Sequence, residues 1–272
     1  MITSEEIKRR LWNGATELRG SMDASRYKDY MLGLMFYKFL SDKTLETFRM
    51  TAGVEKSTEK ELVEEYVKAK IEYGQELEKM IQNVLGYFVS PEYLYQIWLK
   101  DINEGNFEVQ KVADSLNNFE RSIVSSGEVD DFKGLFSSST LDLSDTALGS
   151  NLHERSNNIK SLILLFADLN MVTLQKGDIL GDAYEYLIGQ FAAGSGKKAG
   201  EFYTPQQIST ILSEIVTLDS QDPTTGKKKK FDKVLDFACG SGSLLLNVRK
   251  RIKENGGSVG KIYGQEKNIT TY

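Results

Sequence analysis

The 272-residue sequence predicts a helical N-terminal domain followed by the start of an α/β domain. Residues 1–150 carry apolar side chains at helical spacing between turn-forming residues. In contrast, 234–244 reads as a buried strand, a glycine-rich turn and the start of a helix. A second strand is expected over 261–266, so the α/β part begins as a strand–helix–strand unit with parallel strands. We place the domains at 1–150 and 151–272.

Several helices are expected in the first domain. The chain offers Thr3 or Ser4 as a helix cap, followed by Glu5 and Glu6, and carboxylates are favourable in a first helical turn. The 30–40 run is apolar on more than one side, which predicts a central helix. Further helices are expected over 58–85 as an amphipathic surface helix, from Pro91, and over 107–125. A turn-rich segment at about 137–158 is expected to link the domains.

The second domain should begin with helices and loops that lead to the sheet. Helices are expected over 159–169, 182–191 and 208–216, with loops over 192–200 and 222–230. Thr204 is a good helix cap and Pro205 suits the first helical position, so this pair predicts a helix start whatever the function. The lysines at 227–230 have two interpretations, a solvated loop or a contact with a phosphate backbone.

Composition and charge exclude several classes of protein. The net charge of −5 argues against a chain that holds DNA by its overall field, so local patches or a partner must bring DNA to it. No apolar stretch is long enough to span a bilayer, and the polar, acidic start is unlike a signal peptide. A single cysteine, Cys239, excludes an internal disulfide framework. We therefore expect a cytoplasmic protein with no membrane partner.

The turn after the first strand has the chemistry of a small-molecule pocket. Asp236 lies near the end of the strand, and Gly240 and Gly242 complete a D-x-x-x-G-x-G pattern. Glycines allow positive φ and a close approach to a ligand, and the following helix presents unpaired N–H groups. Ligands of parallel α/β sheets bind at the carboxyl ends of the strands. We therefore expect Asp236, Ala238, Gly240, Ser241, Gly242 and Ser243 to bind a nucleotide-like cofactor.

Two cofactors compete for this turn. A dinucleotide fingerprint requires a third glycine, where the chain has Leu245. S-adenosylmethionine has no pyrophosphate but carries a charged amine and a sulfonium, so the carboxylate of Asp236 suits it better. Glu266, at the end of the second strand, is interpreted as a ribose ligand, with a merely polar strand end as its alternative. We favour S-adenosylmethionine, and a nicotinamide-dependent oxidoreductase is the alternative.

Other catalytic chemistries fit the sequence poorly. The 194–197 segment resembles a phosphate-binding loop, but Phe191 and Lys198 stand where a Walker motif needs glycine and a hydroxyl residue. Its alternatives are a solvated loop and a lid over cofactor or DNA. Cys239 has no base nearby, because the only histidine, His153, lies in the expected linker. The same lone histidine disfavours a Ser-His-Asp centre and a histidine zinc site, and we predict no metal.

Three segments together resemble the motifs of one family. They are Glu-Phe-Tyr-Thr-Pro at 201–205, the turn at 236–242, and Tyr-Gly-Gln-Glu at 263–266. With 18–24 and 30–41, they are similar to the modification (methyltransferase) subunit of type I restriction–modification systems, an adenine-N6 DNA methyltransferase. The resemblance extends over essentially the whole chain. It implies a Rossmann-like, S-adenosylmethionine-dependent fold, in which Gly200, Glu201, Phe202, Tyr203, Thr204 and Pro205 join the turn and Glu266 in binding the cofactor.

The resemblance also implies partners, and one motif departs from it. The implied partners are DNA, a specificity subunit, a second methyltransferase subunit and, in restriction complexes, a motor subunit. The family carries an Asn/Asp-Pro-Pro-aromatic loop that binds a flipped base, whereas Pro91, Pro205 and Pro223 are the only prolines here. We therefore expect the N-terminal portion of the subunit, truncated after the second strand, with no catalytic residue and no activity alone. The alternative is a non-catalytic assembly or inhibitory module that docks on type I partner subunits.

Overall fold

The computed structural model describes residues 4–18, 24–124, 135–136, 141–176, 186, 204, 206–218, 229–240 and 242–266. The chain divides into two compact units, Met1–Leu187 and Ile188–Tyr272. This division lies further along the chain than the boundary at 150 expected from the sequence. The reason is that α7 (Leu152–Leu164) and α8 (Met171–Lys176) pack against α2 (Ala24–Ala52) of the helical unit.

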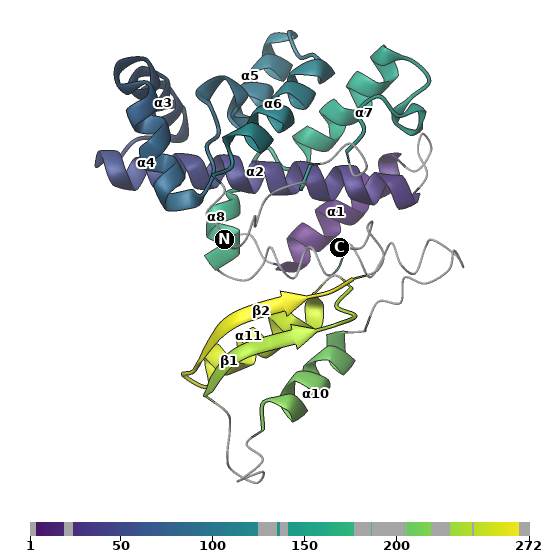
Figure 1. Ribbon diagram of the computed structural model, residues 1–272. Helices are drawn as coiled ribbons and strands as arrows, with labels where there is room; N and C mark the ends of the chain where they lie inside the picture. The colour runs from purple at the N-terminus through teal and green to yellow at the C-terminus, as the bar shows by residue number, and fades with distance from the viewer. Residues whose placement is uncertain are drawn as a thin grey trace. The chain divides into compact units, whose positions relative to one another are not determined.

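The helical unit is built around α2, the long purple helix in Figure 1 on which the shorter helices lie. It follows α1 (Ser4–Leu18), which begins as predicted with Glu5 and Glu6 in its first turn. The buried residues of α2 are not confined to one face of the helix, because several other helices pack against it. The prediction of a central helix at 30–40 is therefore confirmed.

The single helix predicted over 58–85 is wrong, because the structure has two. They are α3 (Glu59–Tyr73) and α4 (Gln75–Leu85). Gly74 separates them with φ of 52° and ψ of −115°, a conformation that favours glycine. Thr58 begins α3 through a capping box: the Thr58 N–H donates to Glu61 Oε2 at 2.8 Å, and Thr58 Oγ1 accepts the Glu61 N–H at 3.4 Å.

The later helices of this unit follow the predicted order with shifted bounds. Pro91 starts a 3₁₀ turn, η1 (Pro91–Tyr93), before α5 (Tyr95–Glu104) and α6 (Val109–Ser122). A second 3₁₀ turn, η2 (Thr146–Leu148), precedes α7. Helix α7 starts at Leu152, inside the expected linker, because the Asn151 side chain accepts the Glu154 N–H at 2.9 Å and caps it.

Aromatic side chains fill the core of the helical unit. The rings of Tyr37 and Trp98 stack with centroids 4.7 Å apart, and Phe119 meets Tyr37 edge-on. The buried polar atoms of these rings have partners: Trp98 Nε1 donates to Ser115 Oγ at 3.0 Å and Tyr37 Oη donates to the Tyr93 carbonyl at 2.9 Å. Such pairing is required because an unpaired buried donor costs about 1–3 kcal/mol.

The second unit contains the predicted strand–helix–strand. Its elements are α10 (Gln206–Val216), β1 (Lys230–Asp236), α11 (Ser243–Glu254) and β2 (Ser258–Gly264). The strands pair in parallel, with Asp236 opposite Gly264. Helix α11 packs against both strands, and α10 packs against α11. Figure 1 shows this unit in green and yellow. Of the helix expected over 182–191, the structure describes only Tyr186, which is helical.

Two expectations about β1 differ from the structure. The strand is not buried, since Leu235 is 64% exposed, and Phe237, directly after the strand, is 79% exposed. Among the described residues, α11 is the helix that packs against the strands, and it leaves these side chains uncovered. Lys230 belongs to β1 rather than to a loop, while 227–228 lie outside the described residues. None of the described helices is both long and apolar enough to cross a membrane.

Candidate cofactor-binding site

The glycine turn, residues 236–242, lies where β1 ends and α11 begins. Gly240 and Gly242 have φ of 55° and 78°, the left-handed region that favours glycine. Among the described residues other than its chain neighbours, a Cβ added at either position would meet no atom within 4 Å, so both glycines border open space in this part of the structure. The Gly242 N–H donates to the Cys239 carbonyl at 2.8 Å and closes the turn. The backbone can therefore approach a ligand closely here.

Three hydrogen bonds join the glycine turn to the end of β2. The Gln265 N–H donates to the Asp236 carbonyl at 2.8 Å, and the Cys239 N–H donates to the Gln265 carbonyl at 3.0 Å. The Gly240 N–H donates to Glu266 Oε2 at 2.9 Å. The two acidic strand ends of the predicted site therefore meet at one edge of the sheet, as parallel pairing requires.

Two carboxylates give this edge its electrostatic character. Asp236 Oδ1 accepts the Ala238 N–H at 3.0 Å, so its side chain is held beside the turn. Burial, followed by the charges of Asp236 and Glu266, raises the pKa of the Cys239 thiol above its usual value. A thiol with a raised pKa forms little thiolate at neutral pH. Cys239 therefore fits the packing role rather than that of a nucleophile, while the two carboxylates favour a cationic ligand.

The structure brings together six of the predicted site residues. They are Asp236, Ala238, Gly240, Gly242, Ser243 and Glu266. Ser243 is the buried first residue of α11, and Thr204 is exposed just before α10. The predicted residues Gly200, Glu201, Phe202, Tyr203, Pro205 and Ser241 lie outside the described residues.

Two residues of this edge were missed as site residues by the sequence reasoning. Gln265 contributes through its backbone, which a side-chain motif does not single out. Gly264 is required by close packing, because a Cβ there would lie 2.7 Å from Cys239 Sγ. The signal that could have found both is the in-register end of β2, since the residues that follow it must lie beside the turn after β1.

The residues present fit S-adenosylmethionine. The ligand has a positive charge at its sulfonium and amine, and Asp236 and Glu266 supply carboxylates beside open space at the two glycines. Carboxylates also accept hydrogen bonds from ribose hydroxyls. In the parts of the chain that the structure describes, no three His, Cys, Asp or Glu side chains are grouped to hold a metal ion.

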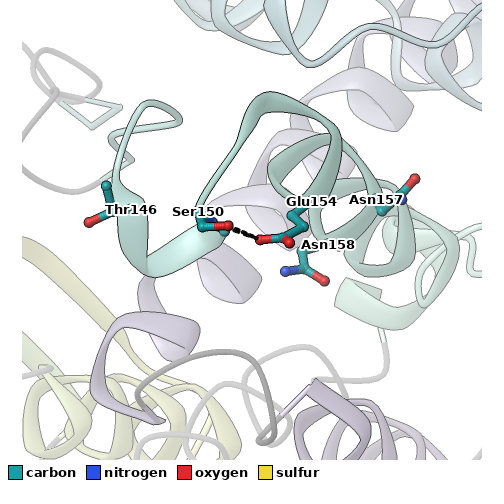
Figure 2. Close-up of a pocket in the computed structure, with 6 residues that line it drawn as sticks. Thr146, Ser150, Glu154, Asn157 and Asn158 are labelled. Atoms are coloured by element: carbon teal, nitrogen blue, oxygen red, sulfur yellow. Dashed lines mark hydrogen bonds between the residues drawn. The ribbon is translucent and has the colours of Figure 1, made fainter.

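A hollow of about 580 Å³ lies in the helical unit at the start of α7. Thr146, Ser150, Glu154, Asn157 and Asn158 line it, as Figure 2 shows. Its polar groups bond to the protein: the Ser150 N–H and hydroxyl donate to Glu154 Oε2 at 2.8 and 2.7 Å, and Asn158 Nδ2 donates to the Leu148 carbonyl at 2.7 Å. These bonds hold the start of α7, and none of the predicted cofactor residues lies here.

Family models match both parts of this chain, and the class of protein they identify is a DNA methylase subunit. Residues 7–166 match the HsdM N-terminal domain, and residues 175–272 match the N-6 DNA Methylase family. The chain belongs to the family of methylase subunits of type I restriction–modification systems, which confirms the resemblance seen in the sequence.

Relatives are found in bacteria and archaea. The chain is 34% identical to the type I restriction enzyme MpnII methylase subunit of Mycoplasma pneumoniae, over 98% of this chain and 48% of the relative. It is 24% identical to the MjaIX methylase subunit of Methanocaldococcus jannaschii, over 98% and 44%. The crystal structure of a type I methyltransferase subunit from Streptococcus thermophilus matches with a TM-score of 0.83 and 35% identity, over 99% of this chain and 54% of that one. The chain thus spans about half the length of these relatives.

Proposed function

We propose that this chain forms the S-adenosylmethionine-binding part of a methyltransferase that modifies N6 of adenine in DNA. The observation that carries the proposal is the edge where Asp236 and Glu266 flank a glycine turn bordered by open space. That edge lies within the residues that match the N-6 DNA Methylase family. The missing third glycine, replaced by Leu245, argues against a dinucleotide.

The proposal gives a role to four residues at this edge of the sheet. When bound, S-adenosylmethionine supplies an activated methyl group. Asp236 orients the cationic methionine end, Glu266 accepts from the ribose hydroxyls, and Gly240 and Gly242 allow close approach. From the sequence alone, we propose that the aromatic pair at 202–203 packs on the cofactor.

Methyl transfer needs residues that these 272 do not contain. Their three prolines are not adjacent, so no Asn/Asp-Pro-Pro-aromatic loop is available to bind a flipped adenine. We therefore propose that the 272 residues bind the cofactor but do not transfer a methyl group alone. No residue of the chain is given a catalytic role.

The proposed partners follow from the family and from the charge of the chain. We propose that the helical unit contacts DNA or partner subunits, and that a specificity subunit and a second methylase subunit complete the complex. A motor subunit joins where restriction accompanies modification. The net charge of −5 supports delivery of DNA by a partner rather than by the overall field of this chain. On the evidence of a single cysteine, we place the complex in the cytoplasm.

Calorimetric titration tests the proposal. S-adenosylmethionine should bind the 272-residue chain, and Asp236→Ala should weaken binding by about tenfold or more, the range expected for a hydrogen bond to a charged group. Asp232→Ala, which removes an exposed carboxylate of the same strand, is the matched control and should bind like the wild type.

The other outcomes of this titration are equally informative. Unchanged affinity in Asp236→Ala would remove Asp236 from the site. Binding of NAD without S-adenosylmethionine would replace the methyltransferase with an oxidoreductase. Binding of neither would leave the assembly module, for which co-purification of the helical unit with a specificity subunit is the direct assay.

A further inference from the structure

We infer that Glu266 is a positioning residue for the glycine turn: its carboxylate holds Gly240 in place before any ligand arrives. The inference rests on the proposed function for its consequence, because the turn it positions is the proposed cofactor site. The hydrogen bond from the Gly240 N–H to Glu266 does not depend on a ligand, so the positioning role can be tested without one.

The contact joins two parts of the sequence that the fold brings together. The Gly240 N–H donates to Glu266 Oε2 at 2.9 Å across 26 residues. The links from the preceding residues of the turn to the end of β2 are backbone bonds, from the Cys239 N–H to the Gln265 carbonyl and from the Gln265 N–H to the Asp236 carbonyl. Gly240 is thus held by a side chain, whereas Asp236 and Cys239 are joined to the end of β2 through the main chain.

The conformation of Gly240 gives this support a purpose. It has φ of 55°, and a Cβ at this position would meet none of the described residues beyond its chain neighbours within 4 Å. Glycine loses more conformational freedom on folding than any other residue, so fixing Gly240 at this φ carries an entropic cost. A hydrogen bond to a charged acceptor is stronger than one to a neutral acceptor and offsets part of this cost.

Holding the turn and binding a ribose are compatible in one carboxylate. Its two oxygens offer about four lone-pair sites, so a bond from one N–H does not exhaust them. Fixing the turn therefore does not by itself exclude a ribose contact at the same carboxylate. It follows that replacing Glu266 should weaken ligands through the shape of the turn, even where a ribose hydroxyl is missing.

The experiment uses the ligand-free 272-residue chain and the amide signal of Gly240 in NMR spectra. In Glu266→Ala, solvent exchange of the Gly240 amide, measured by magnetisation transfer, should accelerate by about tenfold or more, the factor for a lost bond to a charged group. Glu266→Gln keeps an acceptor oxygen and should restore most of the protection. Glu254→Gln, an exposed change at the end of α11, is the control.

A second signal keeps the test decisive if the alanine variant does not fold. The Gly240 amide proton should shift in Glu266→Gln because its acceptor loses its charge. The Gly256 amide, which donates to the Lys253 carbonyl at 2.9 Å in the same unit, should stay in place. A Gly240 amide that neither shifts nor exchanges faster in these variants would overturn the inference.

Titration with S-adenosylmethionine and its 2′-deoxy analogue separates this inference from the proposed function. If Glu266 positions the turn, Glu266→Ala weakens the 2′-deoxy ligand as well, and it weakens S-adenosylmethionine further where the carboxylate also accepts from the 2′-hydroxyl. If it weakens only the ligand with both hydroxyls and leaves the Gly240 amide unchanged, the inference fails and the ribose contact stands. If the wild-type chain binds neither ligand while the Gly240 amide responds to Glu266→Ala, the proposed function fails and the positioning role stands.

Discussion

Lys38 and Asp42 form a buried ion pair within α2. Lys38 Nζ lies 2.8 Å from Asp42 Oδ1, and the two side chains are 1% and 6% exposed. Asp42 also accepts from Gln96 Nε2 of α5 at 2.8 Å and from the Met171 N–H of α8 at 3.0 Å. Burial raises the pKa of Asp42, and the facing ammonium of Lys38 opposes that rise. One carboxylate thus ties three helices together.

Breaking this pair should be costly, whereas removing both charges should not. We expect Lys38→Met and Asp42→Asn each to lower the free energy of unfolding by about 3–5 kcal/mol, because each leaves one buried charge without its opposite charge. In Lys38→Met this is the Asp42 carboxylate, and in Asp42→Asn it is the Lys38 ammonium. The double variant should lose much less than the sum of the two. Urea unfolding followed by tryptophan fluorescence measures all three.

An exposed pair in the same unit provides the control for this cycle. Lys100 and Glu104 lie 3.9 Å apart with side chains 63% and 51% exposed. Removing their charges should change the free energy of unfolding by about 0–1 kcal/mol. Additive losses at Lys38 and Asp42 would show that the two charges do not depend on each other.

Among the elements, α10 packs in an unusual way. Its buried side chains are the small hydroxyl residues Ser209 and Ser213, with Thr217 just beyond its end, whereas Ile211 and Ile215 are 52% and 61% exposed. The hydroxyls bond within the helix and to α11: Ser213 Oγ donates to the Ser209 carbonyl at 2.7 Å, and Asn247 Nδ2 of α11 donates to Ser209 Oγ at 2.8 Å. Small side chains thus allow close approach between the two helices.

The pairing of β1 and β2 depends on a glycine. A Cβ at Gly260 would lie 2.4 Å from the Asp232 carbonyl oxygen, which is backbone and cannot rotate away. We therefore expect Gly260→Ala to separate the strands and to expose the turn that β2 holds. Val259→Ala, a neighbouring change that adds no clash, is the control. Faster alkylation of Cys239 in Gly260→Ala than in Val259→Ala would show the loss of pairing, and equal rates would contradict it.

An element can be predicted from the sequence when local patterns decide it, and not when packing against the rest of the unit decides it. Local patterns were enough to predict the parallel strand–helix–strand unit and the positive φ of Gly240 and Gly242. The reason is that a strand, a glycine turn and a helix in this order are compatible with few other arrangements. The break at Gly74 was missed because an isolated glycine is tolerated inside a helical pattern. Packing on the rest of the unit, which the pattern does not contain, decides whether such a helix continues.

Across the whole molecule, exposure and contacts were the harder part to predict. The apolar run of β1 indicates a buried strand, yet burial depends on what covers the sheet, and the described helices leave Leu235 and Phe237 exposed. In the site, Asp236 and Glu266 could be chosen by side-chain type and position. The bonds through Gln265 could not, because backbone groups are the same in every residue.

The two compact units should differ in stability. The helical unit buries large aromatic side chains, Trp98 and Tyr37 among them, at 0% exposure. The second unit has a two-stranded sheet in the described residues, and isolated two-stranded sheets are marginal in water. Large apolar side chains remain exposed on both its strands and on α10. We therefore expect the second unit to unfold at a lower concentration of denaturant than the helical unit.

The chain has a natural probe in each unit for this comparison. Both tryptophans, Trp12 and Trp98, belong to the helical unit, and the single cysteine, Cys239, belongs to the second unit. In a guanidinium titration, the rise in the rate of Cys239 labelling should have a lower midpoint than the change in tryptophan fluorescence. Trp98→Phe should move the fluorescence midpoint and leave the thiol midpoint in place. Coincident midpoints that shift together in this variant would instead mean that the two units unfold as one cooperative structure.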